Sequence, residues 1–305
     1  MTPSPLFRDP IHDGAADPVI IYSPRDRAWL IFYTNRRADL EEPGYSWVHG
    51  TDIGIAPSLD GGRSWNYRGT VGGLAIEEGR NTFWAPEILF AGGLYHMYVS
   101  YVRGAPATWE HPRRILHYTS ADLSGWAFRS ALDLSSDRVI DACVHRLPGG
   151  RWRMWYKDEA DGSFIHAADS EDLFRWEPIG AVLRDRPQEG PKVFSWMGYY
   201  WMLTDPWKGL GVYRSTDCEL WERRADILAS PGSRTDDGDA ANHADVLVRG
   251  DRAFAFYFVH PERGESPRSR RSSLQAAELS FVDGDLACDR DRAFDLDLDQ
   301  QGSTH

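Results

Sequence analysis

The unit Ser-x-Asp-x-x-x-Trp occurs as SADLSGW at residues 120–126, SEDLFRW at 170–176 and STDCELW at 215–221, and SLDGGRSW at 58–65 repeats it with one extra residue. A short segment of this kind between apolar runs is typical of a tight turn in which the Asp carboxylate accepts backbone N–H groups. We expect the Trp of each unit to pack between neighbouring sheets. Four hairpins of one design, with Asp60, Asp122, Asp172 and Asp217 in their turns, therefore recur along the chain.

The segments around these turns have the composition of short β-strands. WLIFYT, LYHMYVSY, RWRMWYK and RAFAFYFV are rich in aromatic and β-branched residues and are bounded by turn-forming residues. An acidic residue opens a further apolar run in AADPVI, WAPEIL, VIDACV, QEGPKVF and NHADVL. These runs recur every roughly 50 to 70 residues, a spacing close to that of propeller blades. The sequence predicts an all-β chain, with a single five-bladed β-propeller of four-stranded blades at residues 1–288 and an acidic C-terminal tail at 289–305.

A propeller brings the openings of all its innermost strands to one mouth of the central channel. We therefore expect five acids to share that mouth, namely Asp17, Glu87, Asp141, Glu189 and Asp245. The second strand of each blade ends at the same face, with residues Asn35, Arg36, Tyr101, Arg103, Lys157, Asp158, Asp205, Trp207 and His260. Long loops at 36–52, 103–113 and 260–272 favour a walled pocket over an open groove.

Acids that converge on one concave site repel one another and raise some of their pKa values, an arrangement typical of functional sites. Cleavage of a glycosidic bond needs one protonated acid for the leaving oxygen and one ionised base for water. Glu189, followed by Gly190 and Pro191, suits the acid, and Asp17, held before Pro18, suits the base.

At these residues the sequence resembles glycoside hydrolase family 43, the five-bladed propellers of the clan that also holds family 62. The stretch RDPIHDGAADPVI is similar to the first-blade signature of that family, which implies that Asp17 is the general base. VIDACV resembles the motif of the second acid, so Asp141 would tune and orient the general acid, although Ala142 stands where the family often has Pro. In QEGPKVF the general acid of the family falls on Glu189.

The same resemblance implies further site residues. FWAPEIL is similar to the Trp-Ala-Pro-acid motif, with Glu87 in place of the usual Asp, and makes Trp84 a sugar platform. In NHADVL the central-channel His falls on His243, beside which the family often holds a calcium or sodium ion, in contact through water. The chemistry itself requires no cofactor. RRSSLQAAEL resembles the last-blade motif whose Arg reaches the sugar, which falls on Arg270 or Arg271.

Two aromatic residues at the ends of second strands, Tyr101 and Trp207, complete the expected substrate-binding set. The resemblance implies an inverting, exo-acting hydrolase of terminal α-L-arabinofuranosyl or β-D-xylosyl residues on small oligosaccharides. A galactofuranosidase is an alternative. A sialidase-like enzyme is another, since SLDGGRSW reads as an Asp-box, but only one repeat fits fully and sialidases have six blades. A non-catalytic sugar-binding propeller is the remaining alternative, although all three acids are present here.

Charge argues against other classes of partner. The chain has 34 basic and 46 acidic residues, for a net charge of −12, and offers no basic stripe to nucleic acid. No apolar run is long enough to span a membrane, and the opening MTPSPLFRDP has no signal-peptide pattern, which predicts a cytoplasmic protein. Cys143, Cys218 and Cys288 are widely spaced and predict free thiols. The sequence leaves the oligomeric state open.

Overall fold

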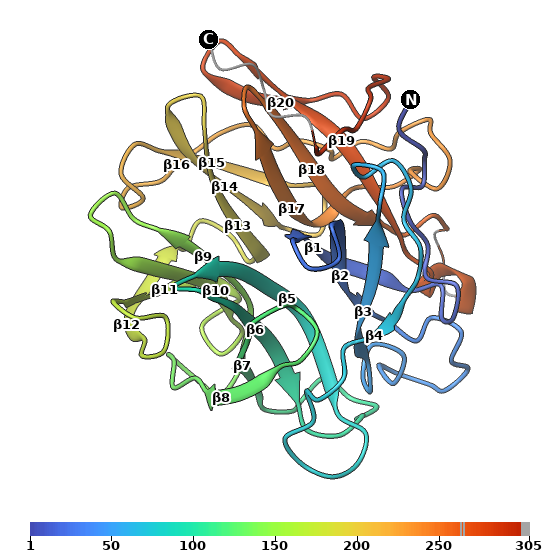
Figure 1. Cartoon of the computed structure of the whole chain (residues 1–305), viewed down its shortest axis with the longest axis vertical. Helices are drawn as coiled ribbons and strands as arrows, with labels where there is room; N and C mark the ends of the chain where they lie inside the picture. The colour runs from blue at the N-terminus through green and yellow to red at the C-terminus, as the bar shows by residue number, and fades with distance from the viewer. Residues whose placement is uncertain (263, 265, 300–305) are drawn as a thin grey trace.

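The computed structural model describes residues 1–262, 264 and 266–299, which form five four-stranded antiparallel sheets arranged around a common axis (Figure 1). Consecutive strands form each sheet, so every blade is one meander, and the predicted five-bladed propeller is confirmed. Apart from the short 3-10 helix η1 (Pro267–Arg270), the regular secondary structure of the described residues consists of β-strands. No helix among them is long and apolar enough to cross a membrane.

The first three blades comprise β1 (Ala15–Ser23), β2 (Ala28–Asn35), β3 (Asp52–Ser58), β4 (Gly69–Thr70); β5 (Thr82–Ala91), β6 (Leu94–Val102), β7 (Arg113–Ser120), β8 (Ala127–Ala131); and β9 (Val139–Arg146), β10 (Trp152–Asp158), β11 (Phe164–Ser170), β12 (Glu177–Leu183). The last two comprise β13 (Glu189–Trp196), β14 (Tyr199–Asp205), β15 (Gly211–Ser215), β16 (Glu222–Arg223); and β17 (Asn242–Arg249), β18 (Arg252–Val259), β19 (Ser273–Val282), β20 (Asp285–Cys288). The inner strands β1, β5, β9, β13 and β17 each contact their two neighbours and line the axis.

The recurring Ser-x-Asp-x-x-x-Trp units form the expected turns. Asp172 accepts the N–H groups of Phe174 and Arg175 at 2.8 and 2.9 Å, and the other three Asp residues accept N–H groups of their own turns. The Trp residues pack against the preceding blade; Trp176, for example, meets Tyr98 edge-on at 5.6 Å. The cysteines are free thiols, as predicted, with Cys143 and Cys218 buried.

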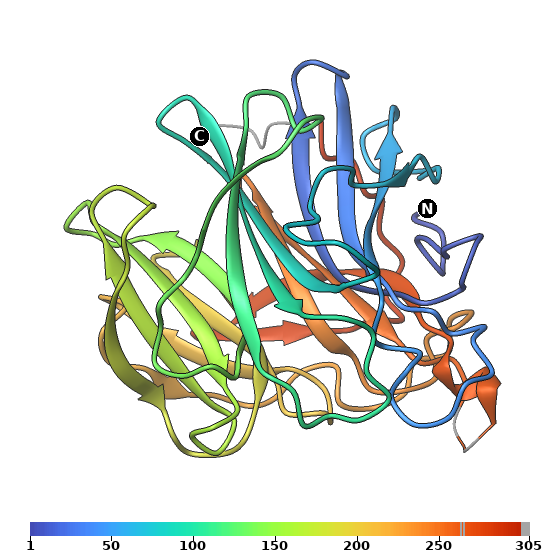
Figure 2. The same ribbon diagram turned by 90° about the horizontal axis from the view of Figure 1, so that it is seen from below.

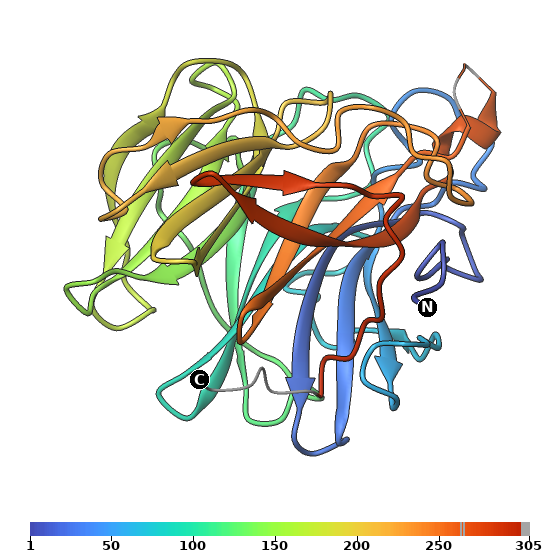
Figure 3. The ribbon, with the colours of Figure 1, turned by 90° about the horizontal axis from the view of Figure 1, so that it is seen from above.

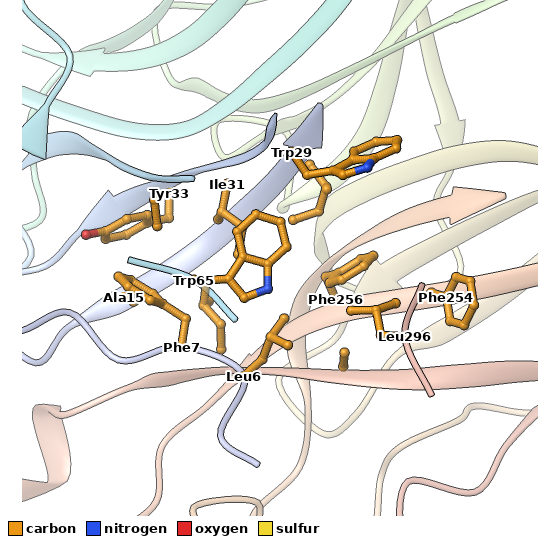
Figure 4. Close-up of a cluster of buried hydrophobic side chains, with 14 of the residues drawn as sticks. Leu6, Phe7, Ala15, Trp29, Ile31, Tyr33, Trp65, Phe254, Phe256 and Leu296 are labelled. Atoms are coloured by element: carbon orange, nitrogen blue, oxygen red, sulfur yellow. The ribbon is translucent and has the colours of Figure 1, made fainter. Parts of the chain in front are cut away.

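The two ends of the chain close the ring. The N-terminal segment pairs with the last blade through Phe7 and Leu274. Figure 3 shows the C-terminal segment, in red, running beside the blue strands of the first blade, where the Leu298 N–H donates to the Gly61 carbonyl at 2.8 Å. Figure 4 shows Leu296 in the same apolar cluster as Trp65. The first part of the expected acidic tail thus packs into the propeller, because its alternating Phe294, Leu296 and Leu298 are buried; residues 300–305 lie outside the described residues.

Candidate active site

Every inner strand carries a β-bulge at the same depth in the channel. The bulges comprise residues 17–18, 85–86, 141–142, 190–191 and 243–244. Asp17 and Asp141 stand at this position with φ of 49° and 61°, a left-handed backbone conformation that is uncommon outside glycine and frequent near active sites. Gly190 also has positive φ, and a Cβ there would lie 2.7 Å from the His243 ring. The bulges re-aim the strands so that side chains enter the mouth.

We call the residues at and beside the bulges the upper ring: Asp17, Asp141, Glu189, Asp205 and His243. Asp17 is buried and faces Arg36, whose Nη2 lies 3.3 Å from its Oδ1, and His243, whose Nδ1 lies 3.5 Å from the same oxygen. The Asp141 carboxylate accepts the Gly190 N–H at 3.2 Å. The predicted catalytic residues Asp17 and Asp141 therefore lie on one level of the channel.

Glu189 opens β13, one residue before its bulge. Its Oε2 lies 2.7 Å from the Lys157 ammonium, and its Oε1 accepts the Trp207 indole N–H at 2.9 Å. Trp207 is 48% exposed and Lys157 lies 5.2 Å from its ring centroid. Trp207 thus borders both the acid and the solvent, which suits the expected contact with sugar.

The carboxyls of Asp141, Glu189 and Asp205 titrate as an interacting group. Burial raises the pKa of Asp141 to about 7, and the charges of Glu189 and Asp17 add to this. Burial likewise raises the pKa of Asp205 to about 7, with Glu189 contributing. Burial also acts to raise the pKa of Glu189, but the Lys157 ammonium and the Trp207 N–H outweigh it and lower that pKa. The ring therefore holds protons near neutral pH beside a carboxylate prepared to ionise.

His243 lies at the centre of this group. Burial acts to lower the pKa of its imidazole, but the surrounding carboxylates, Asp141 first, raise it overall. Its backbone N–H donates to Asp205 at 2.9 Å. No cluster of three or more His, Cys, Asp or Glu among the described residues is arranged to hold a metal. An ion held near His243 through water stays a prediction.

Glu87 and Asp245 lie on a second level, which we call the lower ring with Cys143 and Lys192. Both acids directly follow their bulges and pair with the Lys192 ammonium, at 2.9 and 2.8 Å. Glu87 also accepts the Val144 N–H, and Asp245 the Ile20 N–H. Of the five acids expected at the mouth, these two therefore lie at another depth in the channel, because Glu87 and Asp245 stand two residues further along their strands than the position that Asp17 and Asp141 occupy on theirs.

The three long rim loops meet and form a wall. Tyr45 N–H donates to the Ala107 carbonyl at 2.9 Å, which joins loop 36–51 to loop 103–112. Trp47 meets His260 edge-on at 6.4 Å. Figure 2 shows η1, in orange-red, beside the blue loop 36–51. Arg270 of η1 donates a hydrogen bond to the Leu40 carbonyl of this loop. The wall covers the side of the first, second and fifth blades.

The remaining expected site residues have other neighbours. Trp84 is 6% exposed and stacks on Trp109 at 5.6 Å, so it supports the wall from beneath. Tyr101 packs between the first two blades and bonds to Glu77; it is a core residue and does not face the acids. Arg270 fastens the rim, and Arg271 pairs with Asp13 and Glu262. Neither Arg contacts the three acids through the bonds found among the described residues.

Three residues beside the acids had no role predicted from the sequence: Arg36, Lys157 and Asp205. All three stand at the end of a second strand, so their place at the mouth is predictable, but their partners are not. Arg36 lies over the Phe258 ring at 4.5 Å while it faces Asp17, and thus occupies the position beside the base.

Comparisons with known proteins address the fold. No family model and no curated protein matches the sequence. Solved structures match over nearly the whole chain. A thermostable family 43 glycoside hydrolase is 18% identical, with a TM-score of 0.70 over 92% of this chain and 95% of that chain. A family 43 β-xylosidase/α-arabinofuranosidase from a compost microbial metagenome, in complex with xylotriose, is 14% identical, with a TM-score of 0.67 over 92% and 95%.

A family 43 β-1,3-galactosidase, bound to galactodeoxynojirimycin, is 14% identical, with a TM-score of 0.69 over 94% of this chain and 98% of that chain. These neighbours are too distant in sequence to assign a substrate, but they agree in architecture across the whole propeller. The chain has the five-bladed β-propeller fold of the family 43 glycoside hydrolases, and the resemblance inferred from its motifs is supported at the level of structure.

Proposed function

We propose that the chain is an inverting glycoside hydrolase that removes single terminal α-L-arabinofuranosyl or β-D-xylosyl residues from short oligosaccharides. The observation that carries the proposal is the meeting of Asp17, Asp141 and Glu189 in one walled mouth, each with different partners. The comparison with a β-xylosidase/α-arabinofuranosidase of the same fold supports the choice of pentosides.

In this mechanism Asp17 is the general base. Arg36 is the counter-ion of its carboxylate, and His243 lies on the same oxygen. Both contacts are longer than 3.2 Å, so a water molecule can compete for this carboxylate. The base would take a proton from that water as it attacks the anomeric carbon. Inversion requires room for the water, with roughly 6.5–9.5 Å between the carboxyl groups of base and acid.

Glu189 is the general acid of the proposal. The contacts of its two oxygens with Lys157 and Trp207 favour the ionised carboxylate, so Glu189 can donate a proton near neutral pH only when the neighbouring carboxyls help it to hold one. Asp141 holds a proton up to a pH of about 7 because of its burial. Since interacting carboxyls share their protons, we assign the last proton of the group to Asp141 and Glu189 together. The reaction should fade as this proton is lost.

The rim supports action on chain ends. Loop 36–51 lies against loop 103–112 and η1, which leaves a pocket and not a through-going groove in our proposal. The leaving group would depart past Trp207, on the side of the third and fourth blades, where the rim connections 159–163 and 206–210 are short. An exo-acting enzyme would leave polymer backbones intact.

A galactoside is the second candidate substrate, because a neighbour of the same fold is a β-1,3-galactosidase. A hexose has an exocyclic carbon that a pentopyranose lacks, so the space that the pocket wall leaves for this carbon would determine which of the two sugars binds. A non-catalytic sugar-binding propeller would bind the same sugars without turnover.

The test is a panel of nitrophenyl glycosides, with the anomer of the first-formed product followed by NMR. We expect release of arabinose or xylose with inverted configuration, and no fall in viscosity of an arabinan or xylan. The matched control is Asp17→Asn purified in the same way, which excludes a contaminating hydrolase. A retained anomer contradicts the roles of the acids, an internally cut polymer contradicts the pocket, and binding without turnover favours the non-catalytic alternative.

A further inference from the structure

Three buried side chains of alternating charge connect the proposed acid to the rim. Lys157 Nζ lies 2.7 Å from Glu189 Oε2 and 3.0 Å from Glu159 Oε1. Glu159 Oε2 in turn lies 3.1 Å from Arg113 Nη1, an ion pair without a well-aligned hydrogen bond. The Lys157, Glu159 and Arg113 side chains are 4%, 6% and 1% exposed. Burying a charged side chain costs free energy unless an opposite charge pairs with it. These three side chains must therefore keep their pairing geometry in the folded protein.

The far end of this chain of charges lies under the aromatic wall. The Arg113 guanidinium lies 4.5 Å from the Trp109 ring centroid and donates to the Trp109 carbonyl. Trp109 stacks on Trp84. Lys157 is the penultimate residue of β10, Glu159 directly follows that strand, and Arg113 opens β7, so the connection crosses from the third blade to the second.

We propose that Lys157 is a positioning residue for Glu189. The Lys157 ammonium pairs with Glu159, which pairs in turn with Arg113. Held in this way, the ammonium orients the Glu189 carboxyl and sets the pH above which the catalytic proton is lost. This inference rests on the proposed function, in which Glu189 is the acid. Two contacts fix the carboxyl, since Lys157 holds one oxygen and Trp207 the other.

Other charged groups act on Glu189 from its own blade and from the two neighbouring blades. Asp205 acts from β14, Asp141 from β9 and His243 from β17. These side chains stay in place when Lys157 or Glu159 is replaced, and because Lys157 lowers the pKa of Asp141 as well as that of Glu189, both replacements act on the proton that the two acids share. Lys157 favours the ionised form of Glu189, whereas the negative charge of Glu159 opposes it.

The test uses this opposition of sign. In Lys157→Met the alkaline limb of the kcat/KM profile should move to higher pH by about one unit or more, because the proton is held more tightly. In Glu159→Gln, which keeps an acceptor for Arg113, the limb should move to lower pH. Arg153→Met is the matched control: Arg153 lies on the same strand and is equally buried, but pairs with Asp169 at 2.6 Å, away from the acid. Its limb should stay in place.

A purely structural role for Lys157 predicts lower kcat in both variants with no shift, or shifts of the same sign, and either result overturns the inference. The position of a limb does not depend on how much enzyme is folded, so a loss of stability leaves the test valid. ¹³C NMR titration of labelled Glu carboxyls, assigned with Glu189→Gln, gives the same readout without turnover. If the wild type hydrolyses no glycoside, the proposed function is wrong. If the titration of Glu189 is unchanged in Lys157→Met, this inference is wrong and the proposed function is unaffected.

Discussion

The upper and lower rings of the channel are both built around carboxylates, but they differ in how tightly those carboxylates are held. In the lower ring, Lys192 bridges Glu87 and Asp245 at under 3 Å, and backbone N–H groups take further positions on both acids. In the upper ring, the contacts of Asp17 with Arg36 and His243 are 3.3 and 3.5 Å long. The saturated carboxylates of the lower ring hold the blades together, whereas the loosely held carboxylate of Asp17 can exchange partners with water and sugar.

The largest expected effect is in Asp17→Asn, which removes the proposed base from the upper ring while keeping its shape. Hydrolysis should fall by roughly 10² to 10⁴-fold or more for every substrate, because no group remains to activate water. Steady-state kinetics on aryl glycosides with leaving groups of different pKa would measure this. A loss of less than tenfold, or rescue by a better leaving group, would assign the base elsewhere.

Glu189→Gln should produce a selective loss. Substrates with poor leaving groups need protonation and should slow by roughly 10² to 10⁴-fold, whereas activated aryl glycosides should keep more of their rate. A Brønsted plot of kcat/KM against leaving-group pKa should therefore become steeper than that of the wild type. Equal losses for all leaving groups would show that Glu189 is not the proton donor, and His243 would then be the next candidate.

The lower ring predicts the opposite behaviour for Lys192→Met. Loss of the ammonium leaves Glu87 and Asp245 buried without their cation, which should cost about 3–5 kcal/mol of the free energy of unfolding. Urea unfolding measures this, with Lys208→Met, an exposed lysine, as a control expected to stay within about 0.5 kcal/mol. Unchanged stability together with a large loss of kcat would mean that the lower ring takes part in catalysis.

Asp141→Asn should have the smallest effect. The wild-type alkaline limb is expected near pH 7, where Asp141 loses its proton. Without this acid, Glu189 titrates alone with its lowered pKa, so the limb should move to lower pH by more than about two units. The pH dependence of kcat/KM measures the shift. A limb that stays near pH 7 would place the last proton on Asp205, whose pKa burial also raises to about 7.

The difference between the rings also separates what could be predicted from the sequence from what could not. Five blades were predictable, because each turn motif repeats a local hydrogen-bond pattern that the structure retains. The depth of each acid in the channel was not predictable, because it depends on the position of the β-bulge in its strand. Alignment on Pro18, Pro86 and Pro191, which follow the bulge residue in three blades, would have placed Glu87 after the bulge and Glu189 before it.

Contacts between distant segments were harder to foresee. Arg270 and Arg271 were expected at the sugar, but they fasten loops whose paths depend on the other blades. Arg36, next to the base, carries no motif that distinguishes it from Arg37. Charge pairs of this kind form only when the blades are assembled, so local sequence patterns do not reveal them.

The closure of the ring by residues 294–298 also determines the order in which the protein can mature on the ribosome. Trp29 and Trp65 of the first blade share an apolar cluster with Leu296 and Leu298, which are synthesised after all five blades. At about 5–20 residues per second, that interval is on the order of tens of seconds. For this time the first blade exposes apolar surface that only the end of the described chain can cover. Nascent chains should therefore resist proteolysis only after Leu298 has left the exit tunnel, whichever blades have formed by then.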